Sequence, residues 1–185
     1  MPWFSKKEAE ANEATIQWLI DGFTPRTIVA ESLLSALKIE RTPLSVLEAG
    51  MLVLIRNITS LAIATRGTVY NSDRNSHRIQ KAIRECFLGE FAAIAWKAGL
   101  NAEALSSLCS QRVLSYLPVF DEYQKATLEA DYDGQALIRV ADVGAAALTG
   151  SHEGYSVEAY GLLTWIGHTE VEMIKVVKAK LNESK

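Results

Sequence analysis

Apolar side chains recur at intervals of three and four residues along most of the sequence, and no stretch alternates apolar and polar residues over the length of a strand. A period near 3.6 is typical of helices that bury one face, whereas a half-buried strand has a period of two. The pattern therefore predicts an all-α fold. We expect a single-domain helical bundle of about six to eight helices over residues 1–185, with flexible first few residues and a flexible tail at 182–185.

Helix start and stop signals are clear along much of the chain. Thr24 and Thr42 each precede a proline, which places an N-cap residue before the first helical position. Ser5 followed by Glu8 forms a capping box, and Gly99 is placed to end a helix in a Schellman motif. Together with the apolar periodicity, these signals predict helices over about 5–21, 25–39, 43–66, 73–98, 101–117, 135–148 and 155–182.

Prolines and glycines predict the breaks between these helices. Pro118 is expected to end or kink the fifth helix because it has no N–H for the helical hydrogen bond, and a further helical stretch follows it to about Ala130. Asp131–Gly134 is interpreted as a turn rather than a calcium loop, because its glycine comes at position four and no glutamate stands at position twelve. Gly150–Gly154 is expected to form the loop before the last helix.

Two predicted helices have apolar residues around much of their circumference. The segment 43–66 is apolar nearly all round, which predicts a buried central helix. The long C-terminal helix, about 155–182, is also broadly apolar. Two such helices in a small bundle leave more apolar surface than one core covers, so we expect a homo-oligomer, most simply a homodimer.

Composition and charge narrow the class of protein. Hydrophobic residues make up 49% of the chain and charged residues 22%, which indicates an ordered globular protein. The net charge of -3 argues against a nucleic-acid partner, because phosphates are bound by a basic face. The two cysteines, Cys86 and Cys109, are expected to be reduced and buried among apolar residues.

The sequence also argues against a membrane protein. The N-terminus is charged from Lys6 onward and has no apolar stretch of signal-peptide length, so we expect a cytoplasmic protein. Segment 44–63 is rich in aliphatic residues but contains Glu48, Arg56 and Asn57. Each branched aliphatic residue contributes about −0.3 to −0.6 kcal/mol to the free energy of membrane insertion. A central arginine contributes about +3 kcal/mol and offsets this gain, even before Glu48 and Asn57 are counted. A buried helix in a soluble core explains the segment better.

Arg56 is the first candidate for a functional residue. An unpaired guanidinium inside a highly apolar helix would be strongly destabilising, so Arg56 needs a partner. One interpretation is an ion pair with Glu90, which falls inside an apolar stripe of the fourth helix, or with Glu48 or Glu31. The alternative is an arginine that binds a carboxylate or phosphate in a pocket of the bundle.

Two further groups of polar residues carry weaker signals. His168 and Glu172 lie four apart on the last helix and share a face, a spacing that suits a divalent metal. A di-iron bundle needs Glu-x-x-His motifs and the sequence has none, so a hydrogen-bonded histidine is the simpler interpretation, with no metal and no cofactor predicted. Arg74 and His77, near the start of the fourth helix, are candidates for anion binding through free backbone N–H groups, or belong to an ordinary solvated helix start.

The candidate residues leave two functional hypotheses open. The leading one is a non-catalytic helical interaction or regulatory protein, of the adaptor, immunity or inhibitor type, that binds another macromolecule as a homodimer. The alternative is a small-ligand-binding or catalytic bundle, with an anion or metal site in its core formed by Arg56, Glu90, His168 and Glu172. Neither a phosphate-binding loop nor a nucleophile elbow occurs in the sequence to favour another class.

Overall fold

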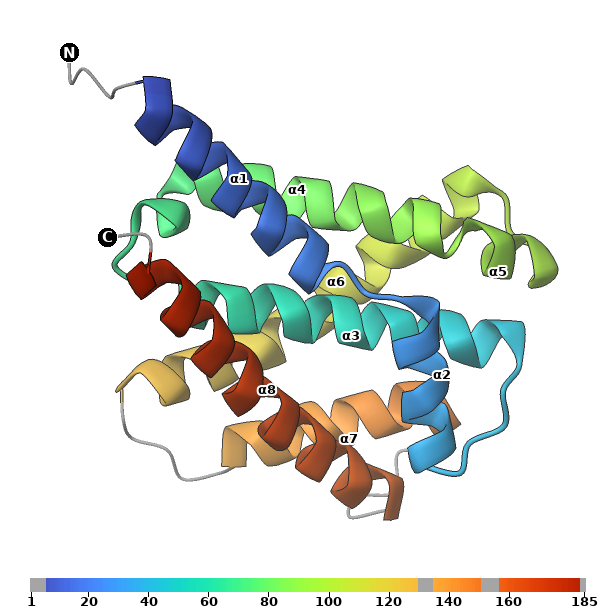
Figure 1. Cartoon of the computed structure of the whole chain (residues 1–185). Coiled ribbons are helices and arrows are strands. Elements are labelled where there is room, and N and C mark those ends of the chain that lie inside the picture. Colours follow the sequence, from blue (N-terminus) through green and yellow to red (C-terminus); the bar gives the residue numbers. More distant parts are fainter. Residues whose placement is uncertain (1–5, 130–134, 151–156, 184–185) are drawn as a thin grey trace.

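The computed structural model describes residues 6–129, 135–150 and 157–183 (Figure 1). All regular secondary structure within these ranges is helical, so the predicted all-α fold is confirmed, including its long C-terminal helix. The predicted Ser5 cap, the Asp131–Gly134 turn and most of the Gly150–Gly154 loop lie outside the described residues. The helices in chain order are α1 (Lys6–Phe23), α2 (Thr27–Ala36), α3 (Pro43–Ala64), the 3-10 helix η1 (Val69–Asn71), α4 (Asp73–Glu90), α5 (Ala92–Lys97), α6 (Ala102–Glu129), α7 (Gln135–Thr149) and α8 (Val157–Glu183).

α3 runs through the middle of the molecule, with α1 and α4 on one side and α7 and α8 on the other (Figure 1). It packs against each of these helices and also against α2, α5 and α6. Of its 22 residues 17 are buried, so the prediction of a buried central helix is confirmed. By length and composition alone α3 would also suit a membrane span, and 89% of the apolar window that qualifies is buried inside the protein.

α3 begins where the sequence predicts. Oγ1 of Thr42 accepts from the N–H of Ser45 at 3.0 Å, and Oγ of Ser45 accepts from the N–H of Thr42 at 2.9 Å. Pro43 occupies the first helical position. The N–H at this position has no acceptor within the helix, so a proline there costs no helical hydrogen bond. The helix ends at Ala64, two residues before the predicted end, and the hydroxyl of Thr65 donates back to a carbonyl of the last turn at 2.8 Å.

α2 begins later than predicted, and the N-cap prediction for Thr24 is wrong. Thr24 is buried and its hydroxyl donates to the carbonyl of Ile20 in α1 at 2.7 Å. The helix starts at Thr27, after Arg26, whose side chain makes no capping hydrogen bond. The N–H of Thr27 instead donates to the carboxylate of Glu90, which lies 63 residues further along the chain. A long-range contact therefore provides the cap that the local pattern assigned to Thr24.

The predicted fourth helix is divided at Phe91 into α4 and α5, which corrects the sequence prediction. Phe91 has φ −94° and ψ 1°. Its buried ring packs on that of Phe87, with the ring centroids 4.5 Å apart. The Phe91 ring also lies directly over Gly50 of α3, where an added Cβ would come within 2.3 Å of it. After α5, Gly99 has a φ of 78° and the following N–H bonds back across the turn at 2.9 Å, which confirms the predicted Schellman end.

α6 is one helix that passes through Pro118, so of the two predicted effects of the proline, an end or a kink, the helix end is wrong. Asn101 caps the start of α6, with its Oδ1 accepting from the N–H of Ala104 at 2.8 Å. Tyr116 and Phe120, on either side of the proline, are both buried. The packing of these two side chains in the core favours a continuous helix. Pro118 has no N–H to donate to the carbonyl four residues earlier, and because the proline lies on the exposed face, water can bind that carbonyl instead.

We expect Gly50→Ala to destabilise the protein by about 2 kcal/mol, because the new methyl group would overlap the Phe91 ring inside a packed core. Gly89→Ala is the matched control, since nothing lies within 4 Å of its Cβ position, and it should be neutral or stabilising by up to about 1 kcal/mol. Chemical denaturation of both variants measures the free energies of unfolding. Equal stabilities would contradict the packing of Phe91 on Gly50.

Candidate functional site

Arg56 lies in the interior, where α3 meets α8. Its side chain is buried, and its Cζ lies 4.4 Å from the ring centroid of Trp165. Nε donates to Oδ1 of Asn57 at 3.1 Å, and Nη1 donates to the hydroxyl of Thr169. Asn57 in turn donates to the carbonyl of Phe23, at the end of α1, at 2.8 Å. The guanidinium therefore joins α3 to α8 and, through Asn57, to α1 by a cation–π contact and charge-assisted hydrogen bonds.

The three carboxylates considered as partners of Arg56 bind other groups. Glu48 accepts from Nε of Arg112 through both of its oxygens, at 2.9 Å each. Glu31 lies 3.9 Å from an arginine in the loop before α3, and Glu90 binds the start of α2. The predicted pairing of Arg56 with one of these carboxylates is therefore wrong, because the fold places a nearer cation or N–H group beside each of them.

Glu90 caps α2. Its Oε1 accepts from the N–H of Thr27 at 3.1 Å and from the Thr27 hydroxyl at 3.2 Å, while Nη1 of Arg26 lies 3.6 Å from its Oε2. The backbone bond from Thr27, with a smaller contribution from the charge of Arg26, lowers the pKa of Glu90 below its ordinary value of 4.5. A carboxylate at a helix N-terminus also interacts favourably with the helix dipole. Glu90 therefore ties α4 to α2.

His168 and Glu172 are both exposed on α8. Glu172 accepts from Nζ of Lys175 at 3.0 Å, and this hydrogen bond lowers the pKa of its carboxyl. No group of three His, Cys, Asp or Glu side chains that would suit a metal occurs among the described residues. Because Arg56 is buried and Glu90 caps α2, the four residues of the predicted core site do not line one pocket.

Arg74 and His77 are exposed in the first two turns of α4. Ser72, at the N-cap position, makes no side-chain capping bond to the helix. The neighbouring Arg78 is paired with Glu13 of α1. Anion binding by Arg74 and His77 stays a prediction.

A partly buried polar cluster at the contact of α3 and α6 could not be predicted from local spacing. It consists of Glu48, which is 6% exposed, the Arg112 guanidinium bound to it, and Tyr116 one turn further along α6. The Tyr116 hydroxyl is buried without a hydrogen-bond partner among the described residues. Burial, and then the negative charge of Glu48, raise the pKa of Tyr116 to about 12. The phenol therefore stays neutral at physiological pH and is unsuited to act as a base.

An open apolar groove lies between α4, α5 and the start of α6. Its volume is about 310 Å³. Trp96, in the last turn of α5, is 78% exposed beside it. A neighbouring hollow of about 220 Å³ shares the same indole. The residues that line the groove are almost all apolar: Leu88, Ala92, Ala95, Trp96, Leu100, Asn101, Ala102 and Leu105.

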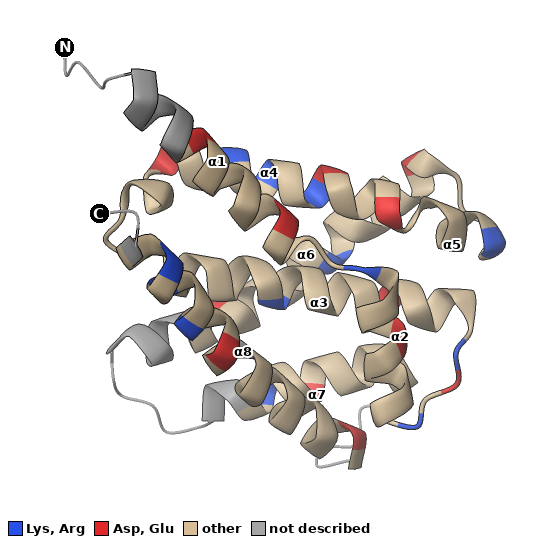
Figure 2. Cartoon of the chain, viewed as in Figure 1, with Lys and Arg blue, Asp and Glu red and all other residues tan. Residues whose placement is uncertain are grey.

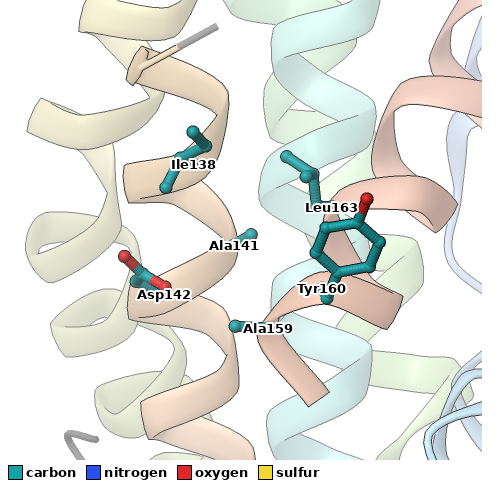
Figure 3. A pocket seen from close by; sticks show the side chains of 6 residues that line it. All are labelled: Ile138, Ala141, Asp142, Ala159, Tyr160 and Leu163. Carbon is teal, nitrogen blue, oxygen red and sulfur yellow. The ribbon is translucent and has the colours of Figure 1, made fainter. Parts of the chain in front are cut away.

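A smaller pocket of about 100 Å³ lies between α7 and α8 (Figure 3). Ile138 and Ala141 of α7 face Tyr160 and Leu163 of α8 across it, and Asp142 lies at its edge. Small-molecule sites usually occupy about 300 Å³ or more. This pocket is therefore suited to one protruding apolar side chain rather than to a substrate.

Comparison with known proteins finds no relative: no family model, no curated protein and no solved structure matches the chain. Inferences about function therefore depend on the geometry of the described residues. Among the features above, the groove beside Trp96 combines an apolar lining, an open surface and an exposed aromatic side chain, which are the properties of a binding surface.

We expect Glu90→Gln to lower the free energy of unfolding by about 1 kcal/mol at pH 7, because α2 loses its charged cap. Folding lowers the pKa of Glu90 below 4.5, so its contribution is fully present above that pH and is lost as the pH falls through the lower folded value. The difference in the free energy of unfolding between wild type and variant should therefore become smaller below about pH 4.

Chemical denaturation at pH 7 and at about pH 3 measures this difference. Glu40→Gln, at an exposed glutamate outside the helices, is the control and should change stability little at either pH. A Glu90→Gln penalty that is the same at both pH values would show that the carboxylate charge does not cap α2.

Proposed function

We propose that this protein is a non-catalytic binding protein, of the adaptor, immunity or inhibitor type, which binds another protein through the groove beside Trp96. The exposed indole is the observation that carries the proposal, since Trp96 is 78% exposed although apolar walls adjoin it. Tryptophan is enriched among the few residues that dominate binding energy once a partner covers them. A protein partner that fills the groove would remove both the indole and the walls from water.

Trp96 is held on a rigid base. Phe91 anchors the start of α5 in the core, and Gly99 ends the helix in a defined turn. Ala95, beside the tryptophan, is only 1% exposed. The backbone that carries the indole therefore loses little freedom when a partner binds, which reduces the entropy lost on association.

The lining of the groove suits an amphipathic helix better than a small polar ligand. Asn101 is the one polar side chain among the described residues that line it, and its Oδ1 already caps α6. Small-molecule sites need placed polar groups to orient the ligand, whereas binding of a helix in a groove needs mainly apolar anchors. Lys97 and Glu103 lie next to lining residues in the sequence and provide charges of both signs for a polar rim.

The alternative of a small-ligand-binding or catalytic bundle has less support. Its candidate residues do not share one buried site, since Arg56 is buried against Trp165 while His168 is exposed on α8. A homodimer, a cytoplasmic location and the absence of nucleic-acid and membrane partners stay predictions.

We expect Trp96→Ala to weaken partner binding by at least about 2 kcal/mol, roughly 30-fold in Kd, because the indole is the largest apolar anchor beside the groove. A photo-crosslinking amino acid at position 92, inside the groove, first identifies the partner in the source cells. Calorimetry with the purified partner then measures its affinity for each variant. Leu114→Ala, at a residue 71% exposed elsewhere on α6, is the control and should bind like wild type. A partner that binds the Trp96→Ala protein unchanged would overturn the proposal, as would the absence of any adduct from position 92.

A further inference from the structure

The outer face of α8 carries a stripe of exposed side chains, here called the α8 stripe: Val157, Tyr160, Thr164, His168 and Val171. Val157 is 85% exposed, Tyr160 73% and Val171 50%. At 3.6 residues per turn, the five positions fall within a sector of about 80°. The opposite face of α8 is buried where the helix packs on α3 and α7. The stripe is therefore a continuous, partly apolar surface that the described helices leave uncovered.

The α8 stripe is symmetric about its midpoint, Thr164. Val157 and Val171 lie seven residues to either side of it, and Tyr160 and His168 lie four residues to either side. A two-fold axis through Thr164 would place two antiparallel copies of α8 so that valine meets valine and the tyrosine ring meets the imidazole. A two-fold homodimer interface requires such self-complementarity, whereas an unrelated partner does not.

The charges on α8 favour the antiparallel direction. Lys175, Lys178 and Lys180 are exposed near its C-terminal end, where Figure 2 shows blue segments. A parallel pair would bring both lysine clusters together and align the two helix dipoles, which is unfavourable. An antiparallel pair places the clusters at opposite ends. The small side chain of Thr164 at the crossing point also lets the two helices approach closely.

We propose that a second copy of this chain covers the α8 stripe, with two antiparallel α8 helices that cross at Thr164. The pair buries both valines and the Tyr160 ring of each copy, and Tyr160 also lines the small apolar pocket against α7 (Figure 3). This inference goes beyond the proposed function and gives a surface to the homodimer that the sequence predicts. It uses a different surface from the groove beside Trp96, so the two proposals fail or succeed separately.

Cysteine crosslinking tests both the surface and the direction. Cys86 is exposed, so the prediction that it is buried is wrong. In a Cys86→Ser background, which removes this thiol, Thr164→Cys should give a disulfide-linked dimer on mild oxidation, because residue 164 of both copies lies at the axis. Val157→Cys and Val171→Cys should each stay monomeric alone and crosslink when mixed. Leu114→Cys, on a surface outside the stripe, measures the background from random collisions and should not crosslink.

Two crosslinking results would overturn the proposal. Val157→Cys that crosslinks efficiently with itself would indicate a parallel pair. Thr164→Cys that forms no more dimer than Leu114→Cys would show that a second copy does not cover the stripe.

Sedimentation equilibrium provides an independent test without cysteines. Tyr160→Arg should weaken the dimer at least about tenfold, because it places a charge inside the interface. Its thermal unfolding, measured under conditions in which both proteins are monomeric, should match wild type because Tyr160 is 73% exposed in the protomer. Leu114→Arg is the control and should dimerise like wild type. A Tyr160→Arg protein that dimerises normally would overturn the proposal, and Trp96→Ala should leave the dimer intact.

Discussion

The burial of α3 on all sides is the constraint on which the other helices depend. Its apolar residues give the bundle a shared core, but Glu48, Arg56 and Asn57 are buried with them. A buried charge without a partner is destabilising by several kcal/mol, so each must be satisfied from a neighbouring helix. Arg112 of α6 binds Glu48, and Trp165 of α8 covers Arg56. Because apolar packing has little directional preference, these polar contacts specify which helix lies on each side of α3.

The same constraint favours a function on the surface. A catalytic bundle would need charged residues in its site, but here such residues connect helices. Arg56 connects α3 to α8, and Glu90 connects α4 to α2. The side chains that the fold does not need for its own packing are then the ones available to partners. Trp96 and the residues of the α8 stripe belong to this second group, and they lie on different helices. The two proposed binding surfaces therefore share no residue.

Several helix ends and the central helix could be predicted from neighbouring residues in the sequence, whereas contacts between distant residues could not. Thr42 and Gly99 act as the helix cap and the helix end that local chemistry indicates, and the apolar pattern identified α3 as central. The cap of α2 by Glu90, the break over Gly50 and the contacts of Arg56 with α8 all need separate helices to meet, which spacing along the chain does not encode. The groove was missed although its lining comes from one continuous segment, residues 88–105, because the break at Phe91 and the turn at Gly99 decide how that segment folds around it.

Hydrogen exchange followed by mass spectrometry tests most directly whether α3 is the element on which the others depend. The contacts of its buried polar groups with α6, α8 and α1 predict that amides within Pro43–Ala64 exchange only when the whole protein unfolds. Their free energies of exchange should then equal the global free energy of unfolding, while the ends of α8 open at lower free energies. Exchange of α3 by local opening, at free energies no higher than those of α7 or α1, would contradict this central role.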